Sequence, residues 1–139
     1  MSRSTMPVPS GPSLVHVLVV EDDADLRPAL AALLELEGFS VETASHGQEA
    51  LDRLRSAQKL PEVLLLDWLM PVMDGRELLT ELAKVPRLSG LPVVVLSGAR
   101  TIELPAGVQP SAVRILAKPA PTNQLVALLR EASTATERR

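Results

Sequence analysis

Residues that could bind a metal ion and accept a phosphoryl group follow four aliphatic runs of this sequence. Glu21 and Asp22 follow one run, Asp67 follows a second, Ser97 ends a third, and Lys118 follows a fourth. If the runs are strands of a parallel sheet that is buried on both faces, their carboxyl ends share one edge, where open α/β sheets place their ligands. We therefore expect carboxylates, a hydroxyl and an amine to converge at a single site.

This set of side chains has a defined chemistry. Glu21, Asp22 and Asp67 supply carboxylates, which are preferred ligands of a hard cation such as Mg²⁺. A carboxylate can also attack phosphorus to form an acyl phosphate, while the metal offsets the charge of the incoming group. Lys118 would add a positive charge at the phosphoryl oxygens, and the Ser97 hydroxyl could donate a hydrogen bond to one of them. A single acid after a strand is more often a helix cap or turn former, but independent caps explain the ordered set poorly.

Alternating apolar runs and amphipathic segments predict the elements that position these residues. We expect strands over residues 14–20, 39–43, 63–66, 93–96 and 113–117. We expect helices from a cap at Asp23 to Gly38, over 48–56 and 76–84, and from Thr122 or Asn123 to about Ala132. Right-handed crossovers then give an α/β fold, a doubly wound, flavodoxin-like sandwich with five parallel strands.

One crossover departs from this regular pattern. Residues 98–110 contain two prolines and two glycines, which disfavour a regular helix. The sequence therefore predicts a short or irregular fourth helix.

Composition limits the classes of protein that fit. The chain has 139 residues, 46% of them hydrophobic, and a net charge of −3, which suits one compact domain. We expect that domain over residues 14–133, between a Ser- and Pro-rich flexible leader (1–13) and a flexible tail (134–139). The aliphatic runs are too short for a membrane span, cysteine is absent, and no basic stretch suggests a nucleic-acid surface.

The ordered motifs resemble the receiver domain of two-component response regulators over about residues 14–133. The resemblance rests on Val-Val-Glu21-Asp22-Asp23, on the segment from Leu-Leu-Asp67-Trp68 to Met73-Asp74-Gly75, on Leu-Ser97-Gly98-Ala99 and on Lys118-Pro119. It implies that Asp67 is the phosphoacceptor and that Asp22, Asp67 and the Leu69 carbonyl ligate Mg²⁺, with Glu21 acting directly or through water. Ser97 and Lys118 would face the phosphoryl group.

The same resemblance implies a function and its partners. The domain would take a phosphoryl group from a histidine kinase or histidine phosphotransfer protein, and would act in the cytoplasm through protein contacts. It would catalyse only its own aspartyl phosphorylation and dephosphorylation. Composition, not the resemblance, is the reason to expect no nucleic-acid or membrane partner. If the chain is a full-length protein, it looks like a stand-alone receiver. Ile115 and Ala120 stand where the family often has aromatic residues, so the customary output face departs from the pattern.

Three other functions fit the sequence less well. A phosphorylation-independent interaction domain could keep the acids as relics. An aspartyl-phosphate phosphohydrolase would need a general acid where Leu69 stands, together with a cap domain. Dinucleotide binding fails because no Gly-x-Gly-x-x-Gly follows the first strand.

The remaining distinctive residues have mainly structural interpretations. Trp68 either contacts a partner or packs on the domain edge, and Met70 and Met73 are expected to pack under the loop. His16 and His46 lack a second ligand at metal spacing. By the resemblance, Leu69 and Ala99 occupy positions that influence how water reaches the acyl phosphate. Because both are apolar, we expect slow autodephosphorylation.

Overall fold

A five-stranded parallel sheet forms the centre of the fold in the computed structural model, which describes residues 14–98 and 102–137. The strands are β1 (Val15–Val20), β2 (Phe39–Ala44), β3 (Val63–Asp67), β4 (Val93–Ser97) and β5 (Val113–Ala117). They lie in the order β2-β1-β3-β4-β5, with all neighbours parallel. The predicted doubly wound α/β fold is confirmed, and the order reverses between β1 and β3, where such sheets bind ligands.

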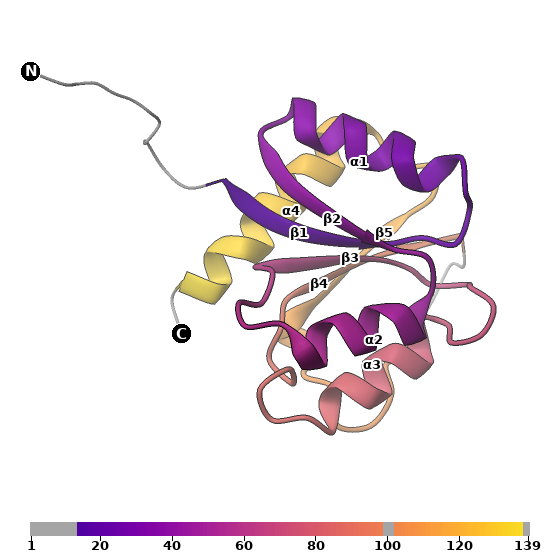
Figure 1. The fold of residues 1–139 in the computed structure, drawn as a ribbon, viewed down its shortest axis with the longest axis vertical. Helices are drawn as coiled ribbons and strands as arrows, with labels where there is room; N and C mark the ends of the chain where they lie inside the picture. Colours follow the sequence, from indigo (N-terminus) through magenta and orange to yellow (C-terminus); the bar gives the residue numbers. More distant parts are fainter. Residues whose placement is uncertain (1–13, 99–101, 138–139) are drawn as a thin grey trace, which may run out of the picture.

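Within the described residues, four α-helices cover the two faces of the sheet. They are α1 (Leu26–Leu36), α2 (Gly47–Ser56), α3 (Gly75–Ala83) and α4 (Thr122–Glu137). Figure 1 shows α1 and α4 on one face and α2 and α3 on the other. No helix among the described residues is both long enough and apolar enough to cross a membrane.

Each face of the sheet has its own apolar core, because successive side chains of a strand point to opposite faces. Leu64 and Leu66 belong to the core under α2 and α3, whereas Val63 and Leu65 belong to the core under α1 and α4. β3 is buried along its whole length. This burial on both sides explains why its sequence is a continuous aliphatic run.

Two helix ends show how well the sequence marked boundaries. Gly38 follows α1 with a φ of 99°, a conformation that glycine adopts without a Cβ clash, and this matches the predicted stop. The prediction that the last helix ends near Ala132 is wrong, because α4 continues to Glu137. Residues 134–137, assigned to a tail from the sequence, are therefore helical. The predicted leader, residues 1–13, lies outside the described residues.

The crossover from β4 to β5 contains no α-helix among its described residues, 98 and 102–112. A single 3-10 turn, η2 (Pro110–Ala112), precedes β5. Ile102, Leu104 and Val108 pack against the core under α2 and α3. The prediction of a short or irregular fourth helix agrees with this loop, which covers the part of the sheet that a helix would otherwise occupy.

Candidate functional site

Three carboxylates meet at the carboxyl ends of β1 and β3. Glu21, Asp22 and Asp67 each offer an oxygen, and these oxygens lie within 4.8 Å of one another. The sheet register causes this meeting, because Val20 pairs with Leu66 and the next residue of each strand is an acid. Glu21 and Asp67 are buried and Asp22 is exposed, so the cluster reaches solvent on the Asp22 side.

Backbone hydrogen bonds hold the segment that carries the first two acids. The amide of Glu21 donates to the carbonyl of Ala44 at 3.1 Å, which ties the end of β1 to the end of β2. Oδ1 of Asp23 accepts from the amides of Asp25 and Leu26, at 2.8 and 2.9 Å, as the chain enters α1. Asp23 thus fills the predicted capping role, although Asp25 is the residue directly before the helix.

Glu21 occupies an environment that suits a bound cation. Its Oε2 accepts from the amide of Asp23 at 3.0 Å, while its buried Oε1 has no hydrogen-bond partner among the residues that the structure describes. Burial raises the pKa of Glu21, and the negative charge of Asp67 raises it further. A buried, unpartnered carboxylate oxygen beside two further carboxylates is an all-oxygen donor set, which fits Mg²⁺.

The predicted amine reaches the acids, and the predicted hydroxyl lies on the neighbouring strand. Nζ of Lys118 donates to Oδ1 of Asp67 at 2.9 Å. Ser97 is the buried last residue of β4, one position beyond Leu96, which pairs with Asp67. The amide of Lys118 donates to the carbonyl of Ser97 at 2.9 Å, so the ends of β4 and β5 are joined. The Lys118–Pro119 peptide bond is cis.

The loop after Asp67 has a constrained backbone. The amide of Met73 donates to the carbonyl of Pro71 at 2.7 Å, which closes a three-residue γ-turn around Val72. Val72 has a φ of 69°, rare for a β-branched residue. The amide of Gly47, at the start of α2, donates to the carbonyl of Met73 at 3.1 Å. Within this loop the side chain of Leu69 is largely exposed, and its carbonyl stays a predicted metal ligand.

Three of the large apolar side chains of this loop pack inward. Trp68, Met70 and Met73 contact the core under α2 and α3, as expected for both methionines. A Cβ added at Gly75 would lie 2.7 Å from Cε3 of Trp68, so the indole ring lies tightly against the start of α3. Packing at the domain edge therefore accounts for Trp68.

Two polar contacts were not foreseen from the sequence. Nδ1 of His46 accepts from the amide of Glu49 at 3.2 Å and caps α2, a position where Ser, Thr, Asp or Asn is usual. Nη1 of Arg27 donates to the carbonyls of Glu21 and Asp22, at 3.0 and 3.4 Å. No spacing rule signals either contact, since each depends on the orientation of a single side chain.

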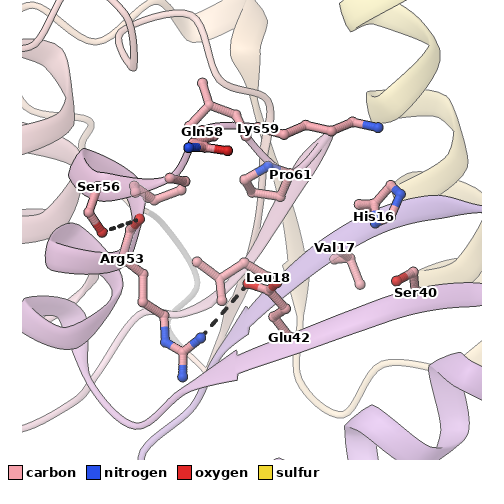
Figure 2. A pocket seen from close by; sticks show the side chains of 13 residues that line it. His16, Val17, Leu18, Ser40, Glu42, Arg53, Ser56, Gln58, Lys59 and Pro61 are labelled. Atoms are coloured by element: carbon pink, nitrogen blue, oxygen red, sulfur yellow. Dashed lines mark hydrogen bonds and ion pairs between the residues drawn. The ribbon is translucent and has the colours of Figure 1, made fainter.

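A separate groove of about 450 Å³ lies away from the acids. Figure 2 shows the polar side chains that line it, from β1, β2, α2 and the segment after α2: His16, Ser40, Glu42, Arg53, Ser56, Gln58 and Lys59. Arg53 forms a 3.8 Å ion pair with Glu42 across it. The groove borders residues 16–18 of β1, whereas the acids follow Val20, its last residue, and none of the predicted site residues lines the groove.

Comparisons with known proteins agree on one family. The family model of the response regulator receiver domain matches residues 17–130. The transcriptional regulatory protein CpxR homolog of Haemophilus influenzae is 41% identical over 115 residues, which cover 82% of this chain and 48% of that protein. The phosphate regulon transcriptional regulatory protein PhoB of Rhizobium meliloti is 36% identical, over 82% of this chain and 50% of that protein. The chain thus spans about half the length of these curated relatives.

Solved structures show the same likeness. The receiver domain of the Francisella response regulator 1452 is similar with a TM-score of 0.74 and 28% identity, over 87% of this chain and 98% of that chain. A CheY-like response regulator receiver domain protein from Methanospirillum hungatei is similar with a TM-score of 0.76 and 25% identity, over 91% of this chain and 98% of that chain.

Proposed function

Because this chain belongs to the response regulator receiver family of two-component signalling, we propose that Asp67 is its phosphoacceptor and that Mg²⁺ supports the transfer. One observation carries this assignment above the others. The buried Asp67 carboxylate has two further carboxylates within 4.8 Å on one side and the Lys118 amine at 2.9 Å on the other. The cation, the phosphoacceptor and the positive charge that binds the phosphoryl group would thus all lie at one edge of the sheet.

Each residue around Asp67 would have its own role in phosphoryl transfer. An oxygen of Asp67 attacks the phosphorus of a phosphohistidine, so a P–O bond forms as the P–N bond breaks and the imidazole leaves. Asp22, Asp67 and the Leu69 carbonyl would hold Mg²⁺, with Glu21 acting directly or through water, and the bound cation would offset the negative charge that accumulates. Lys118 holds a phosphoryl oxygen by its charge, and the Ser97 hydroxyl donates a hydrogen bond to another.

The partners follow from this chemistry. The phosphoryl donor would be a histidine kinase or a histidine phosphotransfer protein, and a cytoplasmic location accords with that donor. Both relatives described above are named as regulators of transcription, but this chain matches a receiver domain over about half of each. We therefore expect the described residues to act through protein contacts and not by binding nucleic acid. The only chemistry expected of the domain is its own phosphorylation and dephosphorylation.

Titration with Mg²⁺ tests the metal part of the proposal. Trp68 directly follows Asp67 and is the only tryptophan, so its fluorescence reports on this site. We expect a saturable change in the wild type and a strongly weakened one in Asp22→Asn. Asp52→Asn is the matched control, since Asp52 lies on α2 and hydrogen-bonds Gln48 instead of joining the cluster. An equal response in all three proteins would contradict the proposed metal site.

A further inference from the structure

Arg27 is bonded to the backbone that carries two of the three clustered acids. It is the second residue of α1 and is half-buried. Its Nη1 donates to the carbonyl of Glu21 at 3.0 Å and to the carbonyl of Asp22 at 3.4 Å. One charged donor group therefore holds the backbone carbonyls of two successive residues that carry acids of the cluster.

The Arg27 hydrogen bonds affect the geometry of the carboxylate cluster. Apart from the Arg27 contacts, two hydrogen bonds hold the segment that carries Glu21 and Asp22. The Glu21 amide donates to the Ala44 carbonyl, and the Asp23 amide donates to the Glu21 carboxylate. A shift of the peptide between Glu21 and Asp22 would move both carboxylates relative to Asp67, which is fixed in β3.

We infer that Arg27 is a positioning residue for the cation site, which it serves by holding the Glu21–Asp22 peptide in the orientation that lets both carboxylates meet Asp67. The inference rests on the proposed function, because the cation concerned is the Mg²⁺ proposed there. Removal of a residue that orients a metal ligand typically lowers metal affinity ten- to a hundred-fold. We therefore expect Arg27→Ala to raise the Kd for Mg²⁺ by about ten-fold or more.

Arg76 provides a matched control within the chain. It too lies in the first turn of a helix, and its Nη1 donates to a carbonyl, that of Glu103, at 2.9 Å. That carbonyl belongs to the β4–β5 crossover and not to an acid of the cluster. Arg76→Ala therefore removes the same kind of hydrogen bond, and we expect it to leave the Kd for Mg²⁺ unchanged.

The test uses the full chain and combines two readouts. Mg²⁺ titration followed by Trp68 fluorescence measures the Kd, and hydrogen exchange of the Asp23 amide without metal measures how firmly the acidic segment is held. We expect Arg27→Ala to weaken Mg²⁺ binding and to speed this exchange. Arg27→Lys keeps the charge and one donor group, so it should show a smaller loss. It also serves as the measured variant if Arg27→Ala does not fold.

Distinct results would overturn the inference and the proposed function. A folded Arg27→Ala protein with wild-type Kd and wild-type exchange at Asp23 would overturn the role of Arg27 alone. So would equal weakening by Arg27→Ala and Arg76→Ala, since that would indicate a general loss of stability. A wild-type chain that gives no response to Mg²⁺ would instead contradict the proposed function, and the inference would fall with it.

Discussion

The Nζ atom of Lys118 lies 2.9 Å from Oδ1 of Asp67, although the two residues are 51 positions apart in the chain. β4 lies between the strands that end at these residues, so the side chain of Lys118 crosses the end of that strand. The Asp67 side chain is 9% exposed, and that of Lys118 is 37% exposed. Lys118 therefore supplies a positive charge that balances this nearly buried carboxylate.

Removing Lys118 should destabilise the metal-free domain. Loss of one partner leaves a buried carboxylate uncompensated, and because Lys118 is partly exposed we expect a cost of about 1–2 kcal/mol for Lys118→Met, below that of a fully buried pair. Denaturant unfolding with and without Mg²⁺ measures it. Mg²⁺ should recover part of the lost stability, because a cation at the cluster offsets the same negative charge.

Lys84→Met is the matched control for this prediction. Lys84, directly after α3, pairs with Glu81 at 3.0 Å, and its side chain is 65% exposed, a setting in which ion pairs contribute little. An equal loss of stability in both variants would argue against a special role for the pair at the site.

Gly47 should resist even the smallest substitution. A Cβ at this position would lie 2.5 Å from the carbonyl oxygen of Met73, which is backbone and cannot turn away. We expect Gly47→Ala to cost about 1–3 kcal/mol in unfolding free energy, as overpacked core sites do. Gly98→Ala is the control, because a Cβ there would have no heavy atom within 4 Å. Similar stability in the two variants would contradict the close contact between α2 and the loop.

The stability of the α2 start should depend on pH through Glu49. Hydrogen bonds from the amide and hydroxyl of Ser45 to Oε1, at 2.8 and 2.7 Å, lower the pKa of Glu49 from its ordinary value of 4.5. A group with a lowered folded pKa stabilises the fold above its unfolded pKa, and this contribution disappears as the pH falls through the folded value. Thermal unfolding of wild type and Glu49→Gln should therefore differ most above pH 4.5 and converge in acid. A difference in thermal stability that stays constant from above pH 4.5 into acid would contradict the prediction.

Much of the site was predictable because the chemistry follows regular strands. The aliphatic run of β3 and the acid that ends it sufficed to place Asp67 at the ligand edge of the sheet. The prolines and glycines of residues 98–110 likewise marked the crossover that lacks a helix among its described residues. In both cases a local property of the backbone determines the structure.

Other features depend on single side chains and were not predictable. The last turn of α4 contains few apolar residues, and hydroxyl contacts within the helix accompany its extension: Ser133 donates to the carbonyl of Arg130 at 2.8 Å and Thr134 to that of Glu131 at 2.8 Å. The bond from Arg27 to two carbonyls depends on one rotamer of a long side chain. Composition and periodicity do not determine such contacts.

The lifetime of the phosphorylated state tests the prediction that the apolar residues Leu69 and Ala99 make autodephosphorylation slow. The Leu69 side chain is 73% exposed beside the site and offers no atom that could orient an attacking water. Ala99, the second apolar position in this prediction, lies outside the described residues. We expect the phosphoryl group to persist well beyond seconds and Leu69→Asn to shorten its lifetime, as followed by intact mass after removal of the phosphoryl donor. Loss within seconds in the wild type would contradict the prediction.

Intact mass spectrometry after incubation with Mg²⁺ and acetyl phosphate tests directly whether Asp67 is the phosphoacceptor. Wild type, Asp67→Asn and the surface control Asp52→Asn would be compared under the same conditions, each first shown to be folded. We predict the added mass of one phosphoryl group on the wild type and on Asp52→Asn, and no added mass on Asp67→Asn. We also predict no added mass on the wild type when Mg²⁺ is chelated before acetyl phosphate is added. Phosphorylation of Asp67→Asn, or none on the folded wild type, would contradict the assignment of Asp67 as the phosphoacceptor.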